Sequence, residues 1–464
     1  MAVRMQSCFN MKRIAFLMAS AISLNSFAGH LAAKCVMEEN SSVITGHNVD
    51  QRLPIASVSK LFTSLFAVAT KGVDSRFITT FYISPVGSDT FDVHLEGSLD
   101  PYFSEQSLHY LISQLNKMNV FKIRNLTFDE NFKFYFNTNG RQIIPGVHGV
   151  FNPVDSQRRL TDPSPELVKK ILANKKQWLQ NYNKTLAKYP DDLVKKPKLA
   201  VHSIEYMPSS KFTSPLKPSG YVRSADLVTQ LKMMNWNSNN HAANMIFESL
   251  GAKPKFDKFF TERLKFKPSE FEFYNGSGNN DTFDGGEGTY NSASCSAVIR
   301  TVKALNHSLA GQKHNLEDIV AVVGADRGAT VQRYAVNVGI NDGVVAKSGT
   351  IQSNVVLAGM INTKKGKYFF AFNYATAGLP RMKKPSASRI ASAMRAEWSR
   401  TRGQVGAELS KLVKSLGGAE SLGYQARPFD LESFEGDDTE TVSDGDIKLE
   451  MQAAGDSDLT QSLE

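Results

Sequence analysis

Apolar residues recur with the spacing of one helix face a short distance into the chain. The residues that share this face are Leu61, Phe62, Leu65, Phe66, Val68 and Ala69. Such a stripe predicts a helix buried on one side, which begins near Ser57 and ends at Gly72. Pro54 suits an extended entry, because proline disfavours helical backbone in the residue before it. The pattern therefore predicts a core helix with polar residues at its entrance.

Similar patterns predict further helices and strands. Helical spacing is found at 105–117, 225–234, 241–250 and 387–416, and strand-like runs at 124–129, 344–346, 355–361 and 368–372. The last two runs are joined by a polar turn at 363–366, which predicts a β-hairpin beside another strand. The longest helix is expected to pack on this sheet, beside a strand from the N-terminal region. The mixture predicts an α+β fold.

The two ends of the chain differ from its body. Lys12 and Arg13 precede an apolar run at 14–24 and then small residues, which predicts a secretory signal peptide over residues 1–28. From residue 429 onward, twelve acidic residues stand against one basic residue, which predicts a disordered tail over 426–464. A second long apolar run is missing, so we expect no transmembrane segment in the mature chain.

Charge and cysteine usage add further limits. The 464 residues carry a formal net charge of +9, so the acidic tail leaves a strongly basic body. A basic surface suits an anionic polymer such as cell-wall material, although general solubility explains it equally well. Export would leave Cys35 and Cys295 in an oxidising compartment, either as a disulfide or as two separate buried thiols. The sequence lacks metal-ligand spacing, a phosphate loop and a nucleic-acid motif, so we expect no cofactor and no nucleic acid.

Ser57 and Lys60 form the first candidate chemical motif. A serine and a lysine three residues apart on a helix lie on the same face, so the amine can take the proton from the hydroxyl. The alternative is a helix N-cap with a solvated lysine nearby. A second Ser-x-x-Lys match, Ser214 to Lys217, stands among prolines and predicts a loop.

Two later segments carry polar groups that suit the same chemistry. Lys347-Ser348-Gly349-Thr350 continues a predicted strand, where its glycine would allow a substrate backbone to come close. The alternative for this segment is a basic residue on an edge strand. Ser238-Asn239-Asn240 interrupts two predicted helices and could direct a hydroxyl and an amide into a cleft. The alternative there is an ordinary helix cap.

The order Ser-x-x-Lys, Ser-x-Asn, Lys-Ser-Gly resembles the motif set of β-lactamases and penicillin-binding proteins. More narrowly, the chain resembles the D-alanyl-D-alanine carboxypeptidase/endopeptidase branch, the PBP4-like or S13 peptidases. A domain-sized segment separates the first two motifs, as in that branch. The stretches 92–101 and 274–278 are also similar to family segments, and the resemblance spans 44–398.

The resemblance implies a fold and a domain arrangement. It implies an antiparallel sheet flanked by helices, in a penicillin-binding catalytic domain made of residues 29–74 and 219–425. An αβ accessory domain over 75–218 would be inserted between the first two motifs. The insert is shorter than in the larger family members and contains a basic helical stretch at 167–188.

The resemblance also implies roles for the motif residues. Ser57 attacks the peptide carbonyl, Lys60 accepts its proton, and Ser238 passes the proton to the leaving amine. Asn240 orients Lys60 and holds the acyl side chain. The backbone N–H groups of Ser57 and Thr350 form the oxyanion hole. The residues implied in carboxylate recognition are Lys347, Ser348, Gly349 and Thr350.

This sequence departs from the family pattern at several places. Asn239 and Asn275 stand where aspartate is common, and Ser348 stands where threonine is usual. All three replacements keep hydrogen-bonding capacity, so we expect activity to survive. An acidic residue that helps hold the substrate's amino end in relatives is missing near 136–146.

The sequence therefore predicts a periplasmic or secreted serine DD-peptidase that acts on peptidoglycan peptides and is acylated by β-lactams. A shorter insert leaves the cleft more open to polymer, which favours cross-link cleavage over removal of the terminal D-alanine. A serine β-lactamase is the enzymatic alternative, and a catalytically silent sensor of cell-wall peptides is the non-enzymatic one. The large insert argues against the first, and intact Ser57, Lys60 and Lys347 argue against the second.

Overall fold

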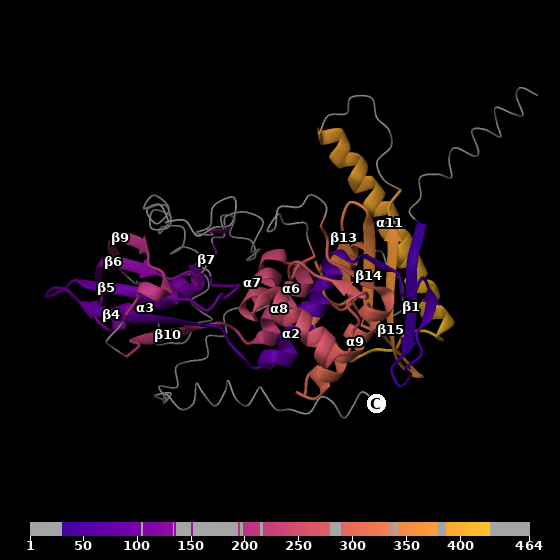
Figure 1. Cartoon of the computed structure of the whole chain (residues 1–464), viewed down its shortest axis with the longest axis horizontal. Helices are drawn as coiled ribbons and strands as arrows, with labels where there is room; N and C mark the ends of the chain where they lie inside the picture. Colours follow the sequence, from indigo (N-terminus) through magenta and orange to yellow (C-terminus); the bar gives the residue numbers. More distant parts are fainter. Residues whose placement is uncertain are drawn as a thin grey trace, which may run out of the picture.

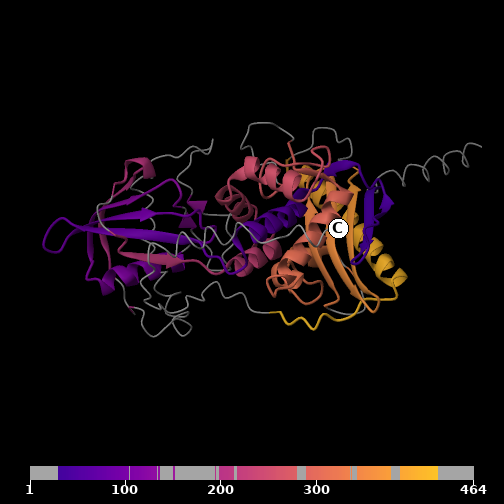
Figure 2. The ribbon, with the colours of Figure 1, turned by 60° about the horizontal axis from the view of Figure 1, so that its bottom comes forward.

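The computed structural model describes residues 30–426, apart from 104, 133, 136–149, 152–193, 195–197, 214–216, 279–288, 335, 337–341 and 378–386. Figures 1 and 2 show a sheet at each end of the long axis, with a group of helices between them. The predicted signal peptide, the basic helix at 167–188, the segment 136–146, Ser214 and the acidic tail after 426 lie outside the described residues.

The first sheet joins the beginning and the end of the folded chain. Within the described residues it has five antiparallel strands in the order β13-β14-β15-β1-β2. Their bounds are β1 His30–Glu38, β2 Thr45–His47, β13 Val344–Thr350, β14 Asn354–Thr363 and β15 Gly366–Ala375. The predicted hairpin is confirmed, with Thr363 opposite Gly366 at its turn. Strand β13 forms one edge of the sheet.

Helices cover both faces of this sheet, because its strands are apolar on both sides. On β15, Phe369 and Ala371 face the core that contains α2 (Ser59–Lys71) and α9 (Cys295–Ala310). Phe370 and Phe372 alternate with them and face the core that contains Val405 and Leu409 of α11. Helix α11 spans Ala387–Ser415, as predicted, and lies along the outer face of the sheet (Figures 1 and 2).

The remaining helices surround α2 and complete the first core. They are α6 Leu227–Asn237, α7 Asn240–Ser249, α8 Ala252–Lys258, η4 Phe259–Arg263 and α10 Leu316–Ile319, whereas η6 Thr330–Tyr334 packs in the other core through Val331 and Tyr334. Phenylalanine rings join them to α2: Phe62 packs against Phe260 and Phe273 with ring centroids 5.3 and 4.8 Å apart. A short sheet of β3 Arg52–Pro54, β11 Phe271–Glu272 and β12 Ser292–Ser294 leads into η1 Ala56–Val58. These contacts fix the start of α2.

The second sheet, within the described residues, has the strand order β10-β4-β5-β6-β9. The bounds are β4 Ile78–Pro85, β5 Phe91–Glu96, β6 Lys122–Phe128, β9 Ala200–Tyr206 and β10 Gly220–Arg223, with smaller elements β7 Phe134–Tyr135, β8 Val150–Phe151 and η3 Ser209–Lys211. Helix α3 (Glu105–Lys117) has the predicted bounds and connects the parallel strands β5 and β6. Its Leu111 and Leu115 share a core with Phe81 and Val93.

The second sheet extends past residue 218, the predicted end of the insert. Strand β10 pairs with β4 from Gly220 opposite Phe81 to Arg223 opposite Ile78, so the second sheet continues to Arg223. At Gly220 an added Cβ would lie 2.4 Å from the Phe81 ring, which explains why the chain can pair closely there. The chain then enters α6, whose first turn is capped by the Asp226 side chain.

A disulfide joins Cys35 of β1 to Cys295 at the start of α9, with Cα atoms 6.0 Å apart. Of the two alternatives open at the sequence level, the paired form is therefore the one present. The bond ties the N-terminal strand to a helix 260 residues later in the chain. Among the described helices, none is both long enough and apolar enough to cross a bilayer.

Candidate active site

Ser57 lies in the η1 turn, just before α2 begins at Ser59, so the 3₁₀ turn rather than the α-helix carries it. Ala56, the residue before it, has φ +48°, in the left-handed region that costs a non-glycine residue energy. The Lys60 side chain is buried, and its Nζ lies 3.0 Å from Ser57 Oγ. The predicted serine–lysine contact across one helical turn is therefore present.

Lys60 also contacts two groups from distant segments. Its Nζ donates to Asn240 Oδ1 at 2.7 Å and to the backbone oxygen of Ser277 at 3.1 Å. Asn240 is the first residue of α7 and belongs to the second motif, while Ser277 belongs to the segment 274–278. Together with Ser57 Oγ these groups hold the Lys60 side-chain nitrogen in a fixed position.

Segment 274–278 packs directly against the turn that carries Ser57. Gly278 has φ +72°, and an added Cβ there would lie 2.1 Å from the oxygen of Ala56. Asn275 Oδ1 accepts hydrogen bonds from the N–H groups of Ser277 and Gly278, at 3.0 and 2.8 Å. Asparagine can make this turn as aspartate does, so the departure at 275 preserves the local structure.

Ser238 stands between α6 and α7 in a left-handed conformation, with φ +55° and ψ +44°. Its Oγ accepts a hydrogen bond from Lys347 Nζ at 3.0 Å. The neighbouring Asn239 caps α7, because its side chain accepts from the Ala242 N–H at 3.1 Å. Asparagine and aspartate are nearly equal as N-caps, so the departure at 239 preserves this local structure.

Strand β13 presents its four motif residues alternately to two sides. Lys347 and Gly349 face the helices: Lys347 reaches Ser238, and an added Cβ at Gly349 would lie 2.9 Å from Ile55 oxygen. Ser348 and Thr350 face the other way. Ser348 Oγ lies 2.8 Å from Thr330 Oγ1, and Thr350 Oγ1 accepts from Arg402. The glycine therefore allows β13 to approach the turn that carries Ser57.

Backbone N–H groups of alternate β13 residues point to the edge that faces away from β14, and residues around Val322 pair with this edge at the start of the strand. Ala346 N–H donates to Ala321 oxygen, and Val344 oxygen accepts from Val323 N–H, both on the side away from β14. Alternate residues of an antiparallel strand point their N–H groups to the same edge. The Thr350 N–H therefore points to this edge. The turn that carries Ser57 packs close by, because a Cβ added to the neighbouring Gly349 would lie 3.1 Å from the Ser57 nitrogen.

Burial governs the electrostatics at Lys347. The side chain is almost completely buried, and this desolvation lowers the pKa of Lys347 to about 7. Its ammonium group can therefore lose its proton near neutral pH, in contact with the hydroxyl of Ser238. In the described ranges, the His, Cys, Asp and Glu side chains form no group that could hold a metal ion.

Several contacting groups have no signature in the sequence. The Ser277 oxygen belongs to the backbone, and its segment stood out only through its resemblance to family sequences. Thr330 and Arg402 come from η6 and α11, with no motif around them. All eight residues predicted for the site belong to the three segments that meet here.

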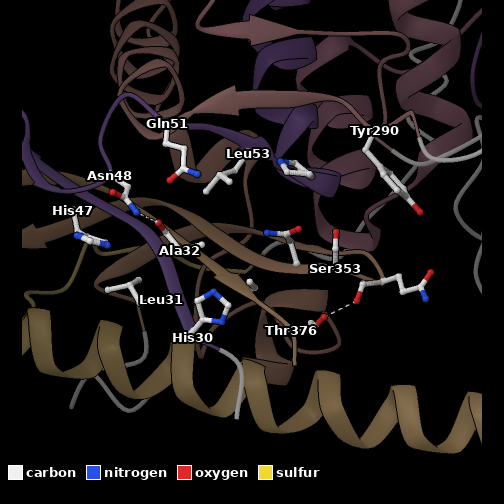
Figure 3. Close-up of a pocket in the computed structure, with 14 residues that line it drawn as sticks. His30, Leu31, Ala32, His47, Asn48, Gln51, Leu53, Tyr290, Ser353 and Thr376 are labelled. Atoms are coloured by element: carbon white, nitrogen blue, oxygen red, sulfur yellow. Dashed lines mark hydrogen bonds between the residues drawn. The ribbon is translucent and has the colours of Figure 1, made fainter. Parts of the chain in front are cut away.

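A separate cavity of about 770 Å³ opens at one end of the first sheet (Figure 3). Its lining includes His30, Asn48, Tyr290 and Ser353, and Asn48 Nδ2 donates to Ala32 oxygen at 2.8 Å. Among the described residues that line it, none of the eight candidate site residues is present. The cavity is therefore distinct from the site around Ser57.

The fold and the site together define a serine peptidase of the penicillin-binding-protein type. The chain belongs to the D-Ala-D-Ala carboxypeptidase 3 (S13) family, whose model matches residues 18–134 and 217–398. It is therefore a serine-type D-Ala-D-Ala peptidase, as the motifs predicted. A search of curated proteins gave no match.

Solved structures support this assignment. The chain is similar to Bd3459, a predatory peptidoglycan endopeptidase from Bdellovibrio bacteriovorus, with 29% identity, a TM-score of 0.71, and coverage of 86% of this chain and 96% of that chain. Bd3459 has also been solved with the immunity protein Bd3460 and in a form acylated by penicillin G. Penicillin-binding protein 4 from Haemophilus influenzae has the same fold, with 13% identity, a TM-score of 0.57, and coverage of 84% and 99%.

Proposed function

We propose that this enzyme hydrolyses the bond between two D-alanines, or between D-alanine and a diamino acid in peptidoglycan cross-links, through an acyl-enzyme on Ser57. The observation that carries the proposal is the contact of Lys60 Nζ with both Ser57 Oγ and Asn240 Oδ1. The similarity to a peptidoglycan endopeptidase over most of both chains supports the substrate class.

In the acylation step, Ser57 Oγ attacks the carbonyl carbon of the scissile bond while Lys60 Nζ takes the hydroxyl proton. The negative charge that develops on the carbonyl oxygen is stabilised by the N–H groups of Ser57 and Thr350. The intermediate then collapses, the C–N bond breaks, and the leaving amine receives a proton from Ser238. Ser238 regains its proton from Lys60, so the proton taken from Ser57 ends on the leaving amine, and Lys347, 3.0 Å from Ser238 Oγ, keeps its own proton.

In the second step, water attacks the ester carbonyl and Ser57 leaves as the free alcohol, which releases the shortened peptide. Penicillin would follow the first step only, because its ring-opened product stays attached and hinders water. Lys347, Ser348 and Thr350 would bind the carboxylate next to the leaving amine. Asn240 would hold the amide of the acyl side chain as well as Lys60.

We place this activity in the periplasm or outside the cell, on the basis of the predicted signal peptide. The disulfide between Cys35 and Cys295 supports an oxidising compartment. Because Bd3459 was solved in complex with an immunity protein, a protein of that kind is the partner we propose for this chain.

Digestion of cross-linked muropeptides tests the proposal. We expect the wild type to cleave dimers to monomers and to gain the mass of penicillin, whereas Ser57→Ala should do neither. Ser214→Ala, in the second Ser-x-x-Lys match, is the matched control and should behave as the wild type. Identical products from wild type and Ser57→Ala would refute the enzyme assignment and leave a sensor role. Rapid release of hydrolysed penicillin would instead identify a β-lactamase.

A further inference from the structure

The cavity at the end of the first sheet is walled by segments that lead into the active site, although none of the motif residues lines it. One wall is the link from β13 to β14 at 352–354, which begins two residues after Thr350. Another wall is Leu53 and Pro54 of β3, and Ser57 follows Pro54 by three residues. Three residues span at most about 11 Å, so the Pro54 wall lies within that distance of the proposed nucleophile.

Hydrogen bonds hold these two walls together. Asn354 Nδ2 donates to Asn373 Oδ1 at 2.7 Å, and Asn373 Nδ2 donates to the backbone oxygen of Pro54 at 2.9 Å. Thr376 Oγ1 donates to the backbone oxygen of Gln352 at 2.7 Å, which ties the end of β15 to the same wall. The place of the cavity relative to the catalytic turn is therefore fixed before a ligand arrives, which lowers the cost of binding.

The lining of the cavity is polar but lacks carboxylate, ammonium and guanidinium groups. Among the described residues that line it, Asp, Glu, Lys and Arg are all missing. Its polar groups are side-chain amides, hydroxyls and two imidazoles, and the side chains of Gln51, Gln352 and Ser353 make no hydrogen bond to another described residue. Figure 3 shows His30, Gln51 and Tyr290 on different sides of this space. Such a lining suits an uncharged ligand rich in hydroxyl and amide groups, whereas a peptide carboxylate would find no lysine or arginine there.

The proposed function sets the direction in which a substrate lies along β13. Its carboxylate would lie at Lys347 and its scissile carbonyl oxygen at the Thr350 N–H, so the N-terminal part of the peptide continues past Thr350 toward 352–354. A stem peptide of four residues extends about 13–14 Å from that carbonyl. This length exceeds the roughly 11 Å between Ser57 and the Pro54 wall, so the sugar that carries the stem peptide reaches the cavity.

The sugar at the N-terminal end of a stem peptide also matches the lining. Its acid group is used in the amide bond to the peptide, so it keeps hydroxyl, ether and N-acetyl groups and no charge. Tyr290 offers a ring face for the apolar side of a sugar ring, together with a hydroxyl. The volume of about 770 Å³ lies within the range of about 300–1,000 Å³ that is typical of sites for small ligands.

We propose that this cavity is a binding site for a neutral N-acetylated disaccharide of the glycan strand, the one attached to the stem peptide that acylates Ser57. This inference rests on the proposed function and adds the glycan to the substrate that the enzyme recognises. Gln51 and Ser353 would bind the hydroxyl and acetamido groups of the sugar. The enzyme then prefers stem peptides that keep their disaccharide over free peptides.

Two forms of the same cross-linked dimer test the inference. One form keeps its disaccharides, and in the other they are removed and the exposed amines are acetylated. We expect wild-type kcat/KM to be about tenfold or more higher with the disaccharides, the effect of a few neutral hydrogen bonds. Gln51→Ala should lose about 3- to 10-fold on the disaccharide form alone. Ser353→Trp, which fills the cavity, should abolish the preference and leave the rate on the free form unchanged.

Two exposed histidines provide a matched pair of variants. His47→Ala removes a lining imidazole from β2 and should lower kcat/KM of the disaccharide form about threefold or more. His202→Ala removes an imidazole from β9 in the second sheet and should change neither rate. If Ser353→Trp does not fold, Gln51→Ala and His47→Ala still supply the comparison.

The outcomes separate the inference from the proposed function. A wild-type enzyme that cleaves both forms at the same rate keeps the proposed function and overturns the glycan site. Equal losses on both forms in Gln51→Ala and His47→Ala would mean a structural role for the lining and would also overturn it. A wild-type enzyme that cleaves neither form and matches Ser57→Ala would end the proposed function, and the inference with it.

Discussion

Gly349→Ala is the sharpest single test of how β13 and the Ser57 turn fit together. An alanine Cβ at this position would lie 2.9 Å from Ile55 oxygen, 3.0 Å from Ala56 Cβ and 3.1 Å from Ser57 nitrogen. These neighbours are backbone or β-carbon atoms, so no flexible side chain can move out of the way. The strand and the turn must therefore separate.

The size of the effect follows from these contacts. Ordinary carbon contacts begin near 3.4 Å, so β13 and η1 must move apart by roughly half an ångström. Overpacking of this kind costs about 1–3 kcal/mol of stability. The catalytic loss should be larger, because the movement displaces the Ser57 N–H relative to the Thr350 N–H. Loss of one oxyanion donor typically lowers kcat by about 10²–10³-fold.

The assay compares acylation by a labelled penicillin and kcat on an N-acylated D-Ala-D-Ala peptide with the melting temperature. We expect Gly349→Ala to lose about 10²-fold or more in both rates while it remains folded at 25 °C. Gly403→Ala is the matched control: its Cβ meets no atom within 4 Å in α11, and it should gain about 0.5–1 kcal/mol. Wild-type acylation by folded Gly349→Ala would refute the packing argument and the proposed oxyanion hole.

Three further predictions concern pH and covalent structure. Because burial lowers the pKa of Lys347 to about 7, the ammonium form that binds a carboxylate is lost from the free enzyme above that pH. We expect kcat/KM to fall about tenfold per pH unit there, and a flat profile from pH 6 to about 9 would contradict this. Burial raises the pKa of Asp100 to about 7, so the native state binds the extra proton and stability falls as pH rises from about 4 to 7. Asp100→Asn should abolish this fall, about 4 kcal/mol, in denaturant titrations at pH 4 and 8, and an unchanged pH dependence would count against it. Replacing Cys35 and Cys295 by serine should lower the free energy of unfolding by about 2–4 kcal/mol with Ser57 acylation kept, whereas an unchanged melting temperature would show that the bond adds nothing.

The parts of the site that could be predicted from sequence are those held by local geometry. Ser57 and Lys60 are one turn apart, so their contact follows from spacing once a helix is predicted. The contact of Lys347 with Ser238 joins segments 109 residues apart, and no spacing rule predicts it. The family resemblance implied only that the two segments share a site. The four residues of β10 are too few for a periodic pattern, so the sequence gives no signal for this strand.

The contacts that could not be predicted share a physical cause. Ser277 acts through a backbone oxygen, which any residue would supply, and Arg402 reaches Thr350 only because α11 packs on the outer face of the sheet. An arginine on a long amphipathic helix is usually exposed to solvent. The sequence around an exposed arginine does not differ from that around one that contacts the sheet, so it does not predict the contact of Arg402.

The backbone conformations of Ala56, which precedes Ser57, and of Ser238 also depend on tertiary contacts. Ala56 and Ser238 have φ of +48° and +55°, which local propensity disfavours for both residue types. Tertiary contacts must therefore impose these conformations. The backbones of Gly349 and Gly278 pack closely against the turn at Ala56, and Lys347 donates a hydrogen bond to Ser238. Strain that is held by tertiary packing keeps both hydroxyls in position before substrate arrives. Local sequence rules fail at these residues because the site depends on the rest of the fold to hold them there.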